Sequence, residues 1–150
     1  MKLSHFTDIG LRTLIYLTQP ARAQPFIISR MAAELHVSSH HLVKVVNFMG
    51  RQGWILTFRG RNGGITLARN PADYRLGTII RILEERSDNA NQLVNCHSPE
   101  CPLSYNCKLK SILQDGMTIF TSFLEQYTLA DAVRNPQALS SLMHIPVVSI

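Results

Sequence analysis

A short basic segment rich in glycine constrains the fold of this chain more than any other stretch. Residues 59–63 have the sequence Arg-Gly-Arg-Asn-Gly and separate two runs rich in β-branched and aromatic residues, 54–58 and 64–68. An Asn-Gly pair between two such runs is typical of a β-hairpin turn. The sequence therefore predicts a two-stranded hairpin whose tip presents Arg59 and Arg61.

Helices are predicted before this hairpin. Apolar residues recur at helical spacing in residues 5–18, 29–36 and 40–52. We expect Ser29 and Ser38 to cap the second and third of these helices, because a serine side chain there accepts a hydrogen bond from a free backbone N–H group. Two helices joined by a brief turn and followed by a basic hairpin describe a winged helix-turn-helix. We therefore expect a mainly α-helical, DNA-binding fold with one small hairpin.

Positive charge is concentrated in the same half of the chain. Residues 1–81 hold eleven Lys and Arg against three acidic residues, a net charge of +8, whereas residues 82–150 hold four against seven, a net charge of −3. This asymmetry is expected if the basic half binds a phosphate-bearing partner, but charge alone does not distinguish this from a solvated basic surface. RNA is disfavoured because the hairpin has no aromatic stacking platform, and an enzyme because no nucleophile or acid–base pair is evident. We predict binding of double-stranded operator DNA through Ser29, Arg30, Ser38, Ser39, His40, His41, Lys44, Arg51, Arg59, Arg61 and Asn62.

The three cysteines of the chain, Cys96, Cys101 and Cys107, all lie in one polar stretch, residues 87–107. Thiolates gather in this way mainly to hold a soft metal ion or an iron–sulfur cluster. The wide spacing favours a cluster over zinc, although a Cys₃His zinc site that includes His97 stays open. A single reactive thiol needs no such companions, and the odd number argues against a disulfide framework.

An amphipathic helix is predicted from about Lys108 to Ala130. Its apolar face is large for a chain of 150 residues to cover, so we expect two chains to pair through it as a homodimer. There is no secretory signal and no run of about 18 apolar residues, so we expect a cytoplasmic protein. The predicted units are a DNA-binding domain (1–86), a metal-binding loop (87–107), a dimerisation helix (108–134) and a flexible tail (135–150).

Three stretches together resemble one family: residues 1–12 (Met-Lys-Leu-Ser-His-Phe-Thr-Asp-Ile-Gly-Leu-Arg), the hairpin segment 59–68 and the cysteine loop. Over residues 1–135 the chain resembles the IscR-like family of bacterial winged-helix iron–sulfur regulators, and within it the nitric-oxide-sensing repressors. The resemblance implies a homodimer whose long helices cross. It also implies that each subunit holds one iron–sulfur cluster, with two or four irons, on Cys96, Cys101 and Cys107.

The resemblance further implies a fourth ligand and a signal. The matching residue is Asp8 of the partner subunit, for which the simpler role is a first-turn carboxylate favoured by the helix dipole. Relatives with a histidine after the third cysteine do not match, because residues 108–110 are Lys-Leu-Lys. The implied function is a repressor that releases genes for nitric-oxide detoxification when nitric oxide reacts with iron. The alternatives are a regulator that responds to cluster availability or iron supply, and a zinc-stabilised DNA-binding protein.

Overall fold

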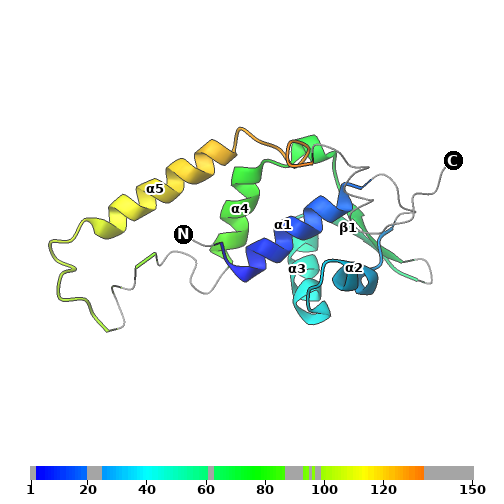
Figure 1. The fold of residues 1–150 in the computed structure, drawn as a ribbon, viewed down its shortest axis with the longest axis horizontal. Coiled ribbons are helices and arrows are strands. Elements are labelled where there is room, and N and C mark those ends of the chain that lie inside the picture. Colours follow the sequence, from blue (N-terminus) through cyan, green and yellow to red (C-terminus); the bar gives the residue numbers. More distant parts are fainter. Residues whose placement is uncertain are drawn as a thin grey trace.

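The computed structural model describes residues 3–19, 25–60, 63–86, 93, 94, 96 and 99–133. Within these ranges the chain is mainly helical with a two-stranded antiparallel sheet. Helices α1 to α4 and the hairpin form a body, and α5 projects from one end of it (Figure 1). The elements are α1 (His5–Leu17), α2 (Ile28–Glu34), α3 (Ser39–Arg51), β1 (Ile55–Phe58), β2 (Gly64–Leu67), a 3₁₀ turn (Pro71–Asp73), α4 (Leu76–Glu85) and α5 (Leu109–Leu124).

Helix α1 runs through the middle of the body and packs against both α3 and α4 (Figure 1). Its N-cap is Ser4, whose hydroxyl oxygen accepts a hydrogen bond from the backbone N–H of Thr7 at 3.1 Å. This bond satisfies one of the N–H groups that a helix leaves free at its start. Seven of the thirteen residues of α1 are buried, so the helix forms the centre of the core.

Helices α2 and α3 are the helix pair that the sequence predicts, with one correction. The N-cap of α2 is Ile27, and Ser29 is an exposed residue inside the first turn. The predicted capping role of Ser29 is therefore wrong, because the helix begins earlier, with a backbone hydrogen bond from Met31 N to Ile27 O at 3.0 Å. Ser38 is the N-cap of α3 as predicted, but its hydroxyl group makes no capping hydrogen bond.

The hairpin that the sequence predicts is present and pairs β1 with β2 in antiparallel orientation. Ile55 lies opposite Leu67, and Phe58 lies opposite Gly64. Near the tip, Gly60 has a φ angle of 107°, a conformation that glycine adopts without strain. The hairpin is also tied to the chain before α2, because the backbone of Phe26 donates to and accepts from that of Ile65 at 2.9 Å in each direction.

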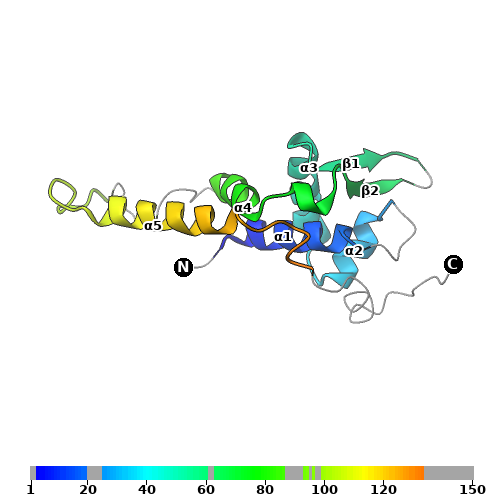
Figure 2. The same ribbon diagram turned by 90° about the horizontal axis from the view of Figure 1, so that it is seen from above.

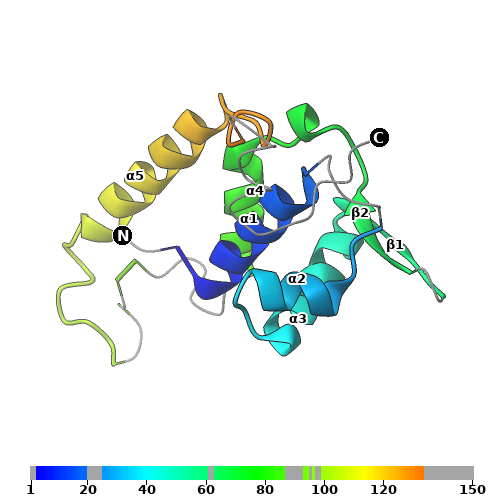
Figure 3. The same cartoon turned by 45° about the vertical axis from the view of Figure 1, so that its right-hand side comes forward.

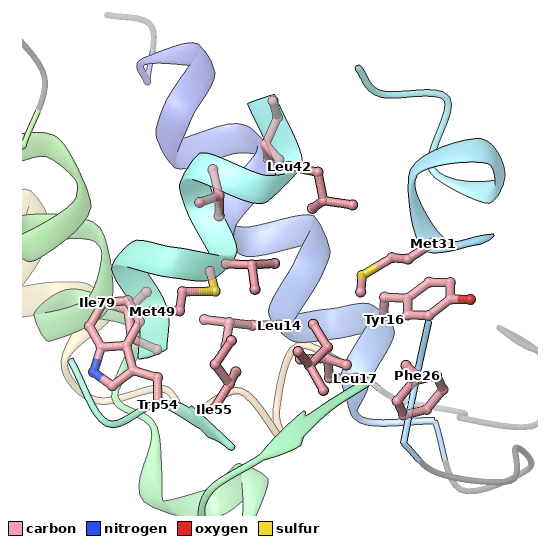
Figure 4. Close-up of a cluster of buried hydrophobic side chains, with 14 of the residues drawn as sticks. Leu14, Tyr16, Leu17, Phe26, Met31, Leu42, Met49, Trp54, Ile55 and Ile79 are labelled. Carbon is pink, nitrogen blue, oxygen red and sulfur yellow. The ribbon is translucent and has the colours of Figure 1, made fainter. Parts of the chain in front are cut away.

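One hydrophobic core joins these elements. Figure 4 shows side chains of α1, α3 and the hairpin meeting between the helices, with Leu14 and Met49 close to the centre. Ile79 and Leu83 add one face of α4 to the same cluster. The core therefore fixes α3 and the hairpin relative to each other, and these are the two elements predicted to bind DNA.

Helix α5 is shorter than predicted. It ends at Leu124, and the following residues turn back so that Leu129 is fully buried in the core of the body. Two backbone hydrogen bonds of 2.9 Å, from Leu76 N to Tyr127 O and from Leu129 N to Tyr74 O, hold this segment beside the start of α4. The predicted helix to Ala130 is therefore too long, whereas the dimerisation unit 108–134 stays a prediction. The predicted tail, 135–150, lies outside the described residues.

Helix α5 extends along the long axis of the molecule, away from the hairpin (Figure 2). None of its sixteen residues is buried. In the described ranges, no helix has both the length and the apolar character that a membrane crossing requires.

Candidate functional site

The first turns of α3 gather polar and basic side chains at one exposed end of the helix. Ser39, His40, His41 and Lys44 are all exposed, whereas Leu42 is fully buried. The helix begins at the lower edge of the body in Figures 1 and 3, away from α5. Free backbone N–H groups and the helix dipole at such an end attract anions, DNA phosphate included.

The other predicted DNA-binding residues are spread more widely. Arg59 is exposed beside the turn of the hairpin, and Arg61 and Asn62 lie outside the described residues. Arg51 is the last residue of α3, twelve residues from Ser39 and therefore about 18 Å further along the helix. The structure thus separates the predicted residues into one group at the start of α3 and others toward the hairpin.

On α2, the predicted DNA-binding residues Ser29 and Arg30 are both exposed. The Nε atom of Arg30 donates to Oε1 of Glu34 at 3.0 Å, one turn further along the helix. The same glutamate accepts a hydrogen bond of 2.6 Å from the hydroxyl group of Tyr16 in α1. Part of the charge of Arg30 is therefore balanced within the protein, which makes it a weaker phosphate ligand than a free guanidinium group.

Helix α1 adds a residue that sequence reasoning missed. The imidazole ring of His5 meets that of His41 edge to face, with 5.6 Å between ring centres. His41 in turn lies 6.1 Å from the ring of His40. No sequence spacing connects residue 5 with residue 41, so only the packing of α1 against α3 reveals that His5 borders the predicted DNA-binding end.

The cysteine loop leads into α5 at the end of the molecule far from the hairpin (Figure 1). All three cysteines are free thiols; Cys96 and Cys101 are half-buried, and Cys107 is exposed. A backbone hydrogen bond of 3.2 Å from Cys101 N to Cys96 O folds the first part of the loop back on itself. His97, the residue considered for a zinc site, lies outside the described residues.

The donor set of this loop fits an iron–sulfur cluster in its chemistry, because thiolates are the ligands that such clusters use. In the part of the chain that the structure describes, however, no three His, Cys, Asp or Glu side chains are grouped closely enough to hold a metal ion. The single chain therefore supplies suitable ligands without bringing them together.

Asp8, the predicted fourth ligand, lies on the outer side of α1. Its Oδ1 atom accepts a hydrogen bond of 2.9 Å from Nε of Arg12, and both side chains are partly exposed. An exposed ion pair of this kind contributes little stability and is easily exchanged for another partner. The carboxylate is therefore accessible from outside the chain, as a ligand for a second subunit must be.

Comparison with known proteins identifies the family of this chain. The sequence matches the Rrf2 family, described as iron-dependent transcriptional regulators, over residues 3–135. Among solved structures, IscR of T. potens is similar at 24% identity and a TM-score of 0.66, covering 89% of this chain and 87% of that one.

Two further structures are similar. CymR, the global cysteine regulator of B. subtilis, has 24% identity and a TM-score of 0.64, with 88% of this chain and 95% of that chain covered. A putative transcriptional regulator from Lactobacillus plantarum reaches a TM-score of 0.70 at 16% identity, covering 93% and 94% of the two chains. These structural likenesses show the winged-helix fold, and the match to the family model shows which family the chain belongs to. The chain belongs to the Rrf2 family of DNA-binding transcriptional regulators, whose members commonly dimerise and are generally not enzymes.

Proposed function

We propose that this protein is a homodimeric repressor of the NsrR type, which binds operator DNA and responds to nitric oxide through an iron–sulfur cluster. The observation that supports the proposal most directly is the cysteine loop. All three cysteines of the chain lie in it, outside the hydrophobic core and as free thiols. The solved structures of similar fold include a cysteine regulator and an IscR, so the loop rather than the fold supports iron as the sensing element.

DNA binding is proposed through the start of α3 and the hairpin. The hydroxyl group of Ser38 makes no capping bond, so both this group and the N–H groups of the first turn are open to a phosphate oxygen. His40, His41 and Lys44 follow along the helix and would face the major groove. Arg59 and Arg61 would contact the DNA beside the groove, as the wing of such a domain does.

Dimerisation is proposed through α5. Its side facing away from α4 is apolar, and Ile112 and Ile119 have 61% and 71% of their surface exposed. An apolar face of this size on a helix with no buried residue is costly in water and favours a second copy of the same helix. Two crossed copies would bury both faces, and each cysteine loop would then adjoin the other subunit.

The metal site is proposed on Cys96, Cys101 and Cys107, with Asp8 of the partner subunit as fourth ligand. When bound, an iron–sulfur cluster supplies iron atoms with which nitric oxide reacts, while the thiols hold it in the loop. The carboxylate of Asp8 would tie α1 of one chain to the loop of the other. Because α1 packs against α3, release of Asp8 would change the separation of the two recognition helices. Half-sites lie about 34–36 Å apart, so a small change in separation weakens binding at both.

Anaerobic purification tests the metal site. We expect a brown protein containing iron and sulfide, and loss of both when Cys96, Cys101 or Cys107 is replaced by Ser. Ser104→Ala, in the same loop, is the matched control and should keep the cluster. Colourless protein containing zinc would contradict the proposal and favour the zinc-stabilised alternative.

Titration with nitric oxide tests the signal. Operator affinity should fall at least about tenfold when nitric oxide is added to the cluster-loaded protein, which corresponds to about 1.4 kcal/mol of coupling. Unchanged affinity with nitric oxide, together with a change on cluster removal, would instead identify a regulator of cluster availability.

The salt dependence of DNA binding tests the hairpin. The double variant Arg59→Ala/Arg61→Ala should bind more weakly and reduce the slope of log K against log salt by about 2, because each arginine would neutralise one phosphate. Arg81→Ala, an exposed arginine of α4 paired with Glu85, is the control and should leave the slope unchanged. An unaltered slope in the double variant would refute the assignment of the hairpin as a wing.

A further inference from the structure

Arg86 stands where the DNA-binding body meets the cysteine loop. It is the C-cap residue of α4 and the last residue before the cysteine loop, residues 87–107. Its guanidinium carbon lies 5.4 Å from the centre of the Phe48 ring and 5.7 Å from the centre of the Phe6 ring. Both distances lie within the range of cation–π attraction. One exposed side chain at the base of the loop therefore contacts both α1 and α3.

The two rings beneath Arg86 are the start of a row of aromatic contacts. The Phe6 and Phe48 rings meet edge to face, with 5.5 Å between their centres. Phe48 also meets Trp54 at right angles, with 6.2 Å between centres. Trp54 is buried just before β1, at the base of the hairpin. The row thus runs from the end of α4 across α1 and α3 to the hairpin.

A second contact fixes the same end of α4 to α1. The Oε1 atom of Glu84 accepts a hydrogen bond of 2.8 Å from the backbone N–H of Ser4, the N-cap residue of α1. The last turn of α4 therefore holds the beginning of α1 through Glu84 while Arg86 rests on Phe6. A displacement of the chain after α4 would act on Arg86 first, because its side chain is exposed and its interactions with the rings are not covalent.

We propose that Arg86 is a positioning residue that transmits the state of the cysteine loop to the recognition helix α3. The inference rests on the proposed function, in which the loop changes state. A loop fixed in place keeps Arg86 on the Phe6 and Phe48 rings and holds α3 in its DNA-binding orientation. A rearranged loop withdraws Arg86, and α3 is then held less firmly through Phe48. An interaction of this type is weak enough to be broken reversibly, yet strong enough to shift an equilibrium several-fold.

The test compares operator affinity with and without the cluster, in wild-type protein and in Arg86→Leu. Leucine keeps an apolar contact with the rings and removes the charge. The ratio of the two affinities should fall about fivefold in the variant, and the loss should occur in the cluster-loaded state. Arg86→Lys should restore part of the ratio, and Arg81→Leu, at an exposed position five residues earlier on α4, should leave it unchanged.

Trp54, the single tryptophan of the chain, gives a second readout that does not involve DNA. In wild-type protein its emission maximum should shift when the cluster is removed, and in Arg86→Leu this shift should be lost. An equal fall of affinity in both states would show that Arg86 is only structural and would overturn the inference. An unchanged ratio in Arg86→Leu would do the same while leaving the proposed function intact. Equal affinities of both states in the wild-type protein would refute the proposed function itself, and the inference with it.

Discussion

The phenolic hydroxyl group of Tyr74 donates a hydrogen bond to the backbone oxygen of Trp54 at 2.6 Å, and so joins the base of the hairpin to the chain before α4. The same hydroxyl oxygen accepts hydrogen bonds from the backbone N–H groups of Ala68 and Arg69, at 3.1 and 3.0 Å. The backbone oxygen of Tyr74 also accepts the bond from Leu129, which belongs to the segment after α5. One residue therefore connects the hairpin, the body and the base of the projecting helix.

Tyr74→Phe is expected to destabilise the protein by about 1–2 kcal/mol, because the ring stays but the N–H group of Arg69 loses its acceptor. Ala68 N–H keeps its second acceptor, the oxygen of Trp54 at 3.0 Å, which limits the loss. Urea unfolding measures the effect. Tyr105→Phe removes the same group from a side chain that is 89% exposed, and should change the stability by less than about 0.5 kcal/mol. Equal effects of the two variants would contradict the assigned role of Tyr74.

A glycine sets how closely α5 approaches the body. A Cβ atom at Gly77 would lie 2.7 Å from the backbone nitrogen of Glu125 and would also overlap the backbone oxygen of Thr121. The carboxylate of Glu125 accepts hydrogen bonds from the backbone N–H and the hydroxyl group of Thr78, at 2.7 and 2.9 Å. The end of α5 thus caps the beginning of α4, and this junction leaves no room for a side chain at residue 77.

Gly77→Ala is therefore expected to cost at least about 2 kcal/mol of stability, because backbone atoms must move apart and the capping bonds lengthen. Gly50→Ala is the matched control: no atom lies within 4 Å of a Cβ built at that helical position. Alanine there should stabilise the protein by about 0.5–1 kcal/mol. Thermal unfolding of both variants measures these changes in stability. If Gly77→Ala were neutral, Gly77 would not lie this close to the backbone of Glu125 in solution.

Local signals in the sequence were sufficient to predict that the helices and the hairpin exist. The spacing of Leu42, Val45 and Met49 along α3 predicts the buried face that the structure shows, and the Gly-rich segment predicts the hairpin. The predicted end of α5 was wrong because Tyr127 continues the helical spacing of apolar residues in the sequence. Pairing of this segment with the start of α4, and burial of Leu129, outweigh that local preference.

Other features of the structure could not be predicted, because no pattern in the sequence indicates them. His36, in the turn before α3, has a φ angle of 53°. The residue type alone does not predict this left-handed conformation. The bridge of Phe26 to the hairpin and the stack of Arg86 on Phe48 join residues far apart in the chain. The cysteine ligands were predicted from clustering alone, and their roles remain predictions because the single chain does not gather them.

Stability at acid pH should depend on Asp131. The hydroxyl group of Thr128 and then its backbone N–H, each donating at 2.7 Å, lower the pKa of this carboxyl below its ordinary value of 3.8, and the charge of Arg75 adds to the effect. Because the folded pKa lies below the unfolded one, the stabilisation is present above about pH 4 and is lost as the pH falls through the lowered pKa. Thr128→Val removes the largest cause and should flatten the fall in unfolding free energy between about pH 4 and pH 2. Thr118→Val, on the exposed side of α5, is the control and should keep the wild-type pH dependence. The prediction would be contradicted if the unfolding free energy of Thr128→Val changed with pH in parallel with that of the wild type.

Ile119→Glu tests whether the apolar face of α5 forms the dimer. The side chain is 71% exposed in the single chain, so a glutamate there should not unfold the monomer. In a dimer of crossed helices the same change places a charge on the buried face of each copy, and burial of an unpaired carboxylate is strongly unfavourable. We expect the dissociation constant of the dimer, measured by sedimentation equilibrium, to rise at least tenfold, and operator binding to become weaker and less cooperative. Ser122→Glu introduces the same charge on the polar side of α5 and should leave the dimer intact. If Ile119→Glu sedimented as the wild-type dimer, the subunits would have to pair through another surface, and the proposed contact between Asp8 and the cysteine loop would lose its geometric basis.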